Sequence, residues 1–136
     1  MALSAATGKT ITPGELNAEL LKRGGYDKNN DIVWGVASKI GGAKATRTWS
    51  SKPAAIENSL KAGKPVVIAV DYKGGSGTDH FVTITATGVD GKGQKVFLAN
   101  DPATGDVVRF YPSPNGLRTY DGGMGNYRST GAVFLS

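Results

Sequence analysis

The spacing of apolar residues changes near residue 65 of this 136-residue chain. Before that point, apolar residues recur every three or four positions, which is the period of an amphipathic helix. After it, they form short runs that are rich in β-branched residues and bounded by turn residues, which is typical of strands. We therefore expect an α+β fold in which N-terminal helices pack on an antiparallel β-sheet.

Three helices are expected in the first part of the chain. The first has the clearest boundaries, because Thr12 can cap it, Pro13 suits its first turn and Gly24 stops it. An Asn-Asp pair at residues 30–31 can cap the second. A Ser-Lys-Pro start at residue 51 opens the third. The expected helices are Pro13–Arg23, residues 31–40 and residues 53–62.

Five strands are expected after residue 65. Residues 66–70 are apolar throughout, which predicts a strand buried on both faces, whereas the next run alternates. Turn residues separate the runs. The stretch from Pro112 to Gly125 is rich in Pro, Gly, Asn and Ser, and we expect it to be a long loop, either functional or mobile. The expected strands are Val66–Val70, Phe81–Ala86, Val96–Leu98, Val107–Tyr111 and Ala132–Leu135.

Length and composition favour a single domain that comprises residues 1–136. With 39% hydrophobic residues the chain can bury one core, and it is too short for two ordinary domains. The N-terminus lacks the basic region and the long apolar core of a signal peptide. No apolar run reaches the roughly 18 residues that a membrane-spanning helix needs, so no membrane span is expected.

The charge and the cysteine count restrict the chemistry. Sixteen Lys and Arg against 11 Asp and Glu give a net charge of +5, which favours anionic partners such as cell-wall polymers, anionic lipid surfaces or nucleic acid. The Lys residues are dispersed and no basic-aromatic motif occurs, so no specific nucleic-acid site is expected. The absence of cysteine excludes disulfides, thiolate zinc sites and a thiolate nucleophile supplied by these residues. With one His and no Cys, we expect neither a metal site nor a cofactor.

His80 is the only histidine and therefore the natural candidate for a base at neutral pH. It lies at the start of one predicted strand, and Asp101 lies at the end of the next. Neighbouring antiparallel strands place two such positions side by side. The carboxylate of Asp101 could then accept the proton of one imidazole nitrogen and leave the other nitrogen to take a proton from a nucleophile. The alternative is a surface histidine beside an Asp-Pro turn, and spacing alone leaves both open.

Three stretches of the chain, in this order, resemble a known group of enzymes. Residues 60–70 contain Gly-Lys-Pro-Val, residues 79–86 read Asp-His-Phe-Val-Thr-Ile-Thr-Ala, and residues 100–105 read Asn-Asp-Pro-Ala-Thr-Gly. They resemble the second half of the papain-like cysteine peptidases of the bacteriocin (double-glycine) leader peptidase-like group. Residues 12–17 and the helix around Trp34 are similar to that group's region downstream of the nucleophile. The resemblance covers about residues 1–111 and implies a papain-like α+β fold.

The resemblance assigns roles to individual residues. It implies that His80 is the catalytic base and that Asp101 is the triad aspartate that orients it. We take Trp34, Asp79 and Phe81 as candidate substrate-binding residues. In that group the nucleophilic Cys starts a helix whose later turns are similar to the Met-Ala-Leu with which this chain begins. We therefore expect the nucleophile helix to be incomplete in this sequence; the alternative is a frayed N-terminal helix that begins at Met1, and the residues leave both open.

Three functions are consistent with these features. The first is a bacterial peptidase or amidase domain that acts on peptidoglycan stem peptides or peptide leaders, inactive as written because it lacks the Cys. The second is a catalytically dead module that binds peptides without cutting them. The third is an interaction domain in which another chain completes the N-terminal helix. If the chain is a fragment of an effector or wall hydrolase, we expect a secreted or cell-wall-directed location.

Overall fold

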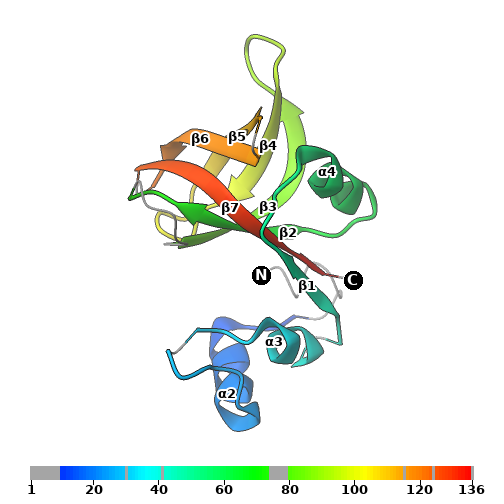
Figure 1. Ribbon diagram of the computed structural model, residues 1–136, viewed down its shortest axis with the longest axis vertical. Helices are drawn as coiled ribbons and strands as arrows, with labels where there is room; N and C mark the ends of the chain where they lie inside the picture. The colour runs from blue at the N-terminus through cyan, green and yellow to red at the C-terminus, as the bar shows by residue number, and fades with distance from the viewer. Residues whose placement is uncertain are drawn as a thin grey trace.

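The computed structural model describes residues 10–29, 31–40, 42–73, 80–114, 116–123 and 125–135 (Figure 1). In this part of the chain, helices precede most of the strands. The helices are α2 (Pro13–Arg23), α3 (Trp34–Ile40) and α4 (Pro53–Lys61). The strands are β1 (Ala45–Thr48), β2 (Val66–Asp71), β3 (His80–Val89), β4 (Lys95–Asn100), β5 (Val107–Ser113), β6 (Gly116–Gly122) and β7 (Gly125–Leu135).

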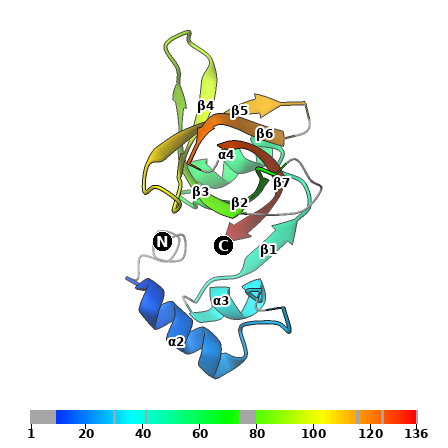
Figure 2. The same cartoon turned by 90° about the vertical axis from the view of Figure 1, so that its left-hand side faces the viewer.

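The strands form one sheet that closes on itself. Their order is β1-β7-β2-β3-β4-β5-β6, and β6 also pairs with β7. Strands β2 to β7 therefore make a closed six-stranded antiparallel barrel, and β1 is added outside it along β7. Figures 1 and 2 show the strands curving round into this barrel. Because closure pairs every strand of the barrel on both sides, it leaves no open edge among them.

The barrel interior holds the main core. Along β2 and β3, every second residue faces inward, as the two-residue period of a strand requires. The inward residues of β2 are fully buried with those of the other strands, and α4 adds Ile56 to the same cluster. This interior cluster consists of Ile56, Val66, Ile68, Val70, Val82, Ile84, Phe97, Ala99, Val108, Phe110, Leu117, Tyr127 and Ala132.

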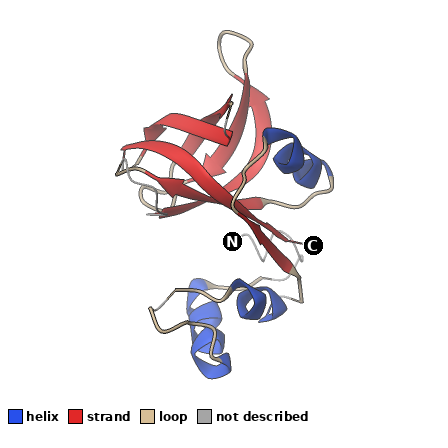
Figure 3. Ribbon diagram, viewed as in Figure 1, coloured by secondary structure: helices blue, strands red, loops and turns tan. Residues whose placement is uncertain are grey.

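The N-terminal helices cover part of the outer face of the barrel. Figure 3 shows α2 and α3 together on one side of the barrel and α4 on another. The outward residues Val67, Val133 and Leu135 pack there against apolar residues that precede or belong to α2 and α3, among them Leu16 and Trp34. Strand β2 is therefore buried on both faces, as its continuous apolar run predicted.

The predicted fold class is wrong. We expected the papain-like α+β arrangement of N-terminal helices packed on an antiparallel β-sheet, but the structure is mainly β, with a closed barrel and three short helices in its described part. The stretch from Pro112 to Gly125, which we expected to be a loop, causes the difference. It completes β5, contains β6 and pairs β6 with both β5 and β7. Its many Gly and polar residues concealed a strand that closes the barrel.

Local signals for the helices were more accurate. Helix α2 has the predicted boundaries: the Oγ1 of Thr12 accepts the Glu15 N–H at 3.2 Å, and Gly24 has φ = 67°. Helix α3 starts later than predicted, because Ile32 forms an isolated bridge with Tyr26 instead. Helix α4 begins at the predicted proline. Over the residues that the structure describes, every helix is too short or too polar to cross a bilayer.

Replacement of Val66 by Ala tests the barrel core. Val66 is fully buried in the interior cluster, whereas Val107 is a strand valine that is 60% exposed. We expect Val66→Ala to lower the free energy of unfolding by about 2 kcal/mol, because it removes two buried methyl groups and leaves a cavity. Val107→Ala should change it by less than about 0.5 kcal/mol. Urea unfolding measures both, and equal losses in the two variants would contradict the assigned core.

Candidate active site

The structure brings His80 and Asp101 together. His80 is the first residue of β3, and Asp101 follows the last residue of β4 directly. Because β3 and β4 pair with Thr83 opposite Asn100, the start of one lies beside the end of the other. His80 Nε2 lies 2.9 Å from Asp101 Oδ1. The His80 side chain is 16% exposed and that of Asp101 is fully buried.

Four donors surround the Asp101 carboxylate. Oδ1 accepts the Ala103 N–H at 2.9 Å in addition to the bond with His80. Oδ2 accepts the Tyr127 O–H at 2.6 Å and the Gly123 N–H at 2.8 Å. A buried carboxylate is tolerated when its oxygens are all hydrogen-bonded, and both oxygens of Asp101 meet that condition.

These contacts determine the protonation of the pair. Burial raises the pKa of Asp101, but the hydrogen bonds from Tyr127, His80 and the Ala103 and Gly123 N–H groups outweigh it and lower the pKa to about 2. Asp101 is therefore ionised at neutral pH and can only accept hydrogen bonds. It follows that His80 Nε2 carries a proton, and that in the neutral ring Nδ1 is the nitrogen that can accept one.

Tyr127 and Gly123, which supply half of the hydrogen bonds to the Asp101 side chain, were not predicted from the sequence. Both come from the region where β6 turns into β7, and most of that region was taken for a loop. The Gly122-Gly123 pair was the only available signal, because adjacent glycines can mark a close approach of the backbone to another group. Nothing in the sequence connects Tyr127 with an aspartate 26 residues earlier.

The candidate substrate-binding residues do not join this pair. Trp34 and Phe81 contact each other, with ring centroids 5.6 Å apart, and pack against the outer apolar cluster. Phe81 therefore faces the helices, whereas His80 contacts Tyr127 on the inner side of β3. Trp34 also lines an apolar hollow of about 230 Å³ between the helices and the barrel. Asp79 lies outside the described residues.

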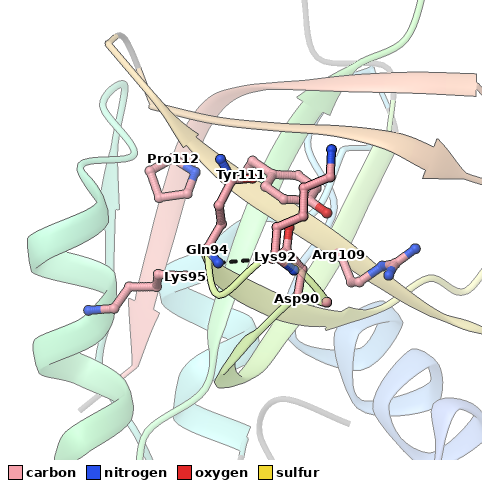
Figure 4. A pocket seen from close by; sticks show the side chains of 8 residues that line it. Asp90, Lys92, Gln94, Lys95, Arg109, Tyr111 and Pro112 are labelled. Carbon is pink, nitrogen blue, oxygen red and sulfur yellow. Dashed lines mark hydrogen bonds between the residues drawn. The ribbon is translucent and has the colours of Figure 1, made fainter.

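A larger open hollow of about 870 Å³ lies at the opposite end of β3, around the turn into β4 (Figure 4). It contains Lys92, Lys95 and Arg109, but acidic groups lie close to these cations. Glu57 Oε1 is 2.7 Å from Lys95 Nζ, and Asp90 Oδ1 accepts the backbone N–H of Lys92. The residues that line this hollow do not include His80 or Asp101. Among the described residues, no cluster of His, Asp and Glu could hold a metal ion.

An imidazole whose Nε2–H is held by a buried carboxylate has the geometry that the base and the orienter of a nucleophile–His–Asp hydrolase site require. Comparison with known families agrees with this class: residues 1–133 match the family model described as Peptidase_C39 like family. The chain belongs to this family, which confirms the predicted relationship to C39 papain-like cysteine peptidases and makes it a peptidase-type domain. No curated protein and no solved structure matches the chain.

The low pKa of Asp101 predicts a loss of stability in acid. Because the folded-state pKa is about 2 and the unfolded value is near 4, the stabilisation is complete above about pH 5 and is lost as the pH falls towards 2. We expect Asp101 to contribute about 2 kcal/mol to the difference in unfolding free energy between pH 6 and pH 2. Asp101→Asn should remove this part of the pH dependence.

Urea unfolding at a series of pH values measures the effect. Asp106→Asn, at an exposed position in the same turn, is the matched control and should follow the wild-type curve. A curve for Asp101→Asn that is parallel to the wild type between pH 5 and pH 2 would show that the carboxylate is not held as described.

Proposed function

We propose that this domain carries the base and the orienting carboxylate of a peptidase or amidase, with His80 as general base and Asp101 as its orienter. The observation that supports this most directly is the 2.9 Å contact between His80 Nε2 and a fully buried, ionised Asp101. Membership of the Peptidase_C39 like family supports the reaction class. Neither observation depends on the other.

In the proposed reaction, His80 Nδ1 takes the proton of a cysteine thiol, and the thiolate attacks the carbonyl carbon of a peptide bond. The imidazolium that forms keeps its Nε2–H on Asp101, whose negative charge stabilises it. The same nitrogen, Nδ1, then returns the proton to the leaving amine. The 136 residues contain no cysteine, so the thiol has to come from outside them.

The substrates that we propose are peptides, either leader peptides or the stem peptides of peptidoglycan. The net charge of +5 suits an enzyme that works near an anionic cell wall, because it raises the local concentration of such a substrate around the protein. The charge favours the peptidoglycan substrate over a neutral peptide and does not select the bond that is cut.

One observation favours a second function, which is peptide binding without cleavage. These residues lack any cysteine, yet the His80–Asp101 contact and its surrounding donors are complete. A domain that has lost its nucleophile can keep the geometry of the inherited site. His80 would then be a contact for the peptide rather than a base.

Extending the chain separates the two functions. The DNA upstream of the Met1 codon is sequenced. The protein extended by the upstream codons and the 136-residue chain are then expressed in parallel. If the first function is correct, an in-frame Cys lies within about one helix length, roughly 15 residues, and only the extended protein cleaves a peptidoglycan stem peptide or a leader peptide. His80→Ala should lower kcat/KM by at least about a hundredfold, because it removes the general base.

Cleavage products are measured by mass spectrometry with and without prior alkylation of thiols by iodoacetamide. Gln94→Ala, at the opposite end of β3, is the control and should keep full activity. Cleavage that survives alkylation or the loss of His80 would refute the cysteine mechanism. An extended protein without Cys that binds the stem peptide but leaves it intact would establish the second function.

A further inference from the structure

We propose that Tyr127 and the backbone of Gly123 are positioning residues, which hold Asp101 in the one orientation that presents Oδ1 to His80. As a statement about catalysis this inference rests on the proposed function; as a statement about the orientation of His80 it does not. Both residues come from the β6–β7 hairpin, which contains the last two strands of the chain. The pairing of these two strands closes the barrel. The catalytic pair would therefore depend on barrel closure.

Tyr127 contacts both members of the pair. Its O–H donates to Asp101 Oδ2 at 2.6 Å, which is short, as expected for a bond to a charged acceptor. Its ring centroid lies 5.6 Å from that of His80, with a tilt of 53° between the rings. The Tyr127 ring thus packs beside the imidazole of His80. One side chain thus acts on the carboxylate through its hydroxyl and on the imidazole through its ring.

The direction of the Tyr127 hydroxyl is set by the barrel core. The residue is fully buried, and its ring packs against Phe110 and Tyr72 with centroid distances of 6.4 Å and 6.3 Å. A ring enclosed on several sides cannot turn without displacing its neighbours, because protein interiors are close-packed. The phenol therefore points at Asp101 before any substrate or nucleophile arrives.

The neighbouring side chains leave little room for a Cβ atom at Gly123. A Cβ at this position would lie 2.5 Å from Thr104 Cγ2, which is closer than real Cβ contacts allow, and 3.0 Å from Asp101 Oδ2, which is unusually tight. Any side chain would push the hairpin away from Asp101 and weaken the 2.8 Å bond from the Gly123 N–H. At Gly122, an added Cβ would meet the Tyr127 ring at 2.6 Å. The glycine pair lets the hairpin approach the carboxylate and the tyrosine together.

Occupation of Oδ2 has a geometric consequence for His80. With Tyr127 and Gly123 on Oδ2 and the Ala103 N–H on Oδ1, rotation of the carboxylate would break several hydrogen bonds at once. The acceptor for His80 Nε2 is therefore held in place, and packing against the Tyr127 ring restricts the plane of the imidazole. Since Nδ1 is fixed relative to Nε2 by the ring, its direction towards a nucleophile is fixed as well.

Tyr127→Phe in the 136-residue chain tests the inference without any nucleophile. NMR follows the Asp101 side-chain carbon as a function of pH, together with the imidazole nitrogens of His80, which are unambiguous because it is the only histidine. We expect the Asp101 midpoint to rise by about one pH unit or more, since a hydrogen bond to the charged form is lost. The His80 ring should change from a single Nε2–H form to a mixture of the two neutral forms.

Tyr26→Phe is the matched control. It also removes a phenol O–H bond of 2.6 Å, in this case to Asn17 on the surface. It should leave the titration of Asp101 and the signals of His80 unchanged. A Tyr127→Phe protein that is folded and keeps both readouts at their wild-type values would overturn the proposal.

Gly123→Ala provides a second variant that leaves the tyrosine in place. We expect it to change both readouts in the same direction as Tyr127→Phe. Its control is Gly91→Ala, because a Cβ at Gly91 meets nothing within 4 Å. A folded Gly123→Ala protein with wild-type readouts would show that the hairpin backbone does not hold Asp101.

The test of the positioning role and the test of the peptidase function can fail independently. If the extended protein cleaves no peptide while the two variants shift the Asp101 and His80 signals, the positioning role stands and the peptidase function fails. If the extended protein cleaves peptide, Tyr127→Phe should lower kcat about tenfold or more with little change in KM, because it acts on the base rather than on substrate binding. Unchanged kcat together with unchanged NMR signals would overturn the positioning role and leave the peptidase function intact.

Discussion

The buried negative charge of Asp101 is the constraint around which this site is built. An ionised carboxylate removed from water is costly unless donors replace the lost hydration. Here one imidazole, one phenol and two backbone N–H groups do so, and they come from β3, from the turn after β4 and from the β6–β7 region. Satisfying one side chain therefore requires segments more than 20 residues apart in the sequence to meet at one end of the barrel.

Barrel closure supplies that meeting point. Strands β3 and β4 are neighbours along the chain, so the contact between His80 and Asp101 needs only a local hairpin. The other two donors come from the β6–β7 hairpin, in which Gly123 lies between the strands and Tyr127 belongs to β7, and β7 pairs with both β2 and β6. The core residues Phe110 and Tyr72 then hold the Tyr127 ring in place. The same packing that stabilises the barrel aligns the proposed base.

The chain contains a candidate base and orienting carboxylate but no candidate thiol nucleophile. The proposed base His80 and its proposed orienter Asp101 are in contact and almost wholly buried, whereas the 136 residues provide no thiol for such a base to activate. The pair could be kept for use with a cysteine outside these residues or as part of a peptide-binding surface. In either case the orientation of His80 follows from Asp101, since Oδ2 is already occupied by other donors.

Local features of the sequence determined much of this protein. Capping and glycine signals defined α2, β-branched runs located most strands, and the order of His80 and Asp101 on neighbouring strands predicted their contact, because each of these depends on residues close in sequence. Only the tertiary structure decided that the sheet closes. The Pro112–Gly125 stretch lacks an apolar pattern, and its β6 strand is defined by pairing with two other strands. Tyr127 and Gly123 reach Asp101 for the same reason. Phe81 follows His80 directly in β3, so its side chain lies on the opposite face of the strand, where it contacts Trp34.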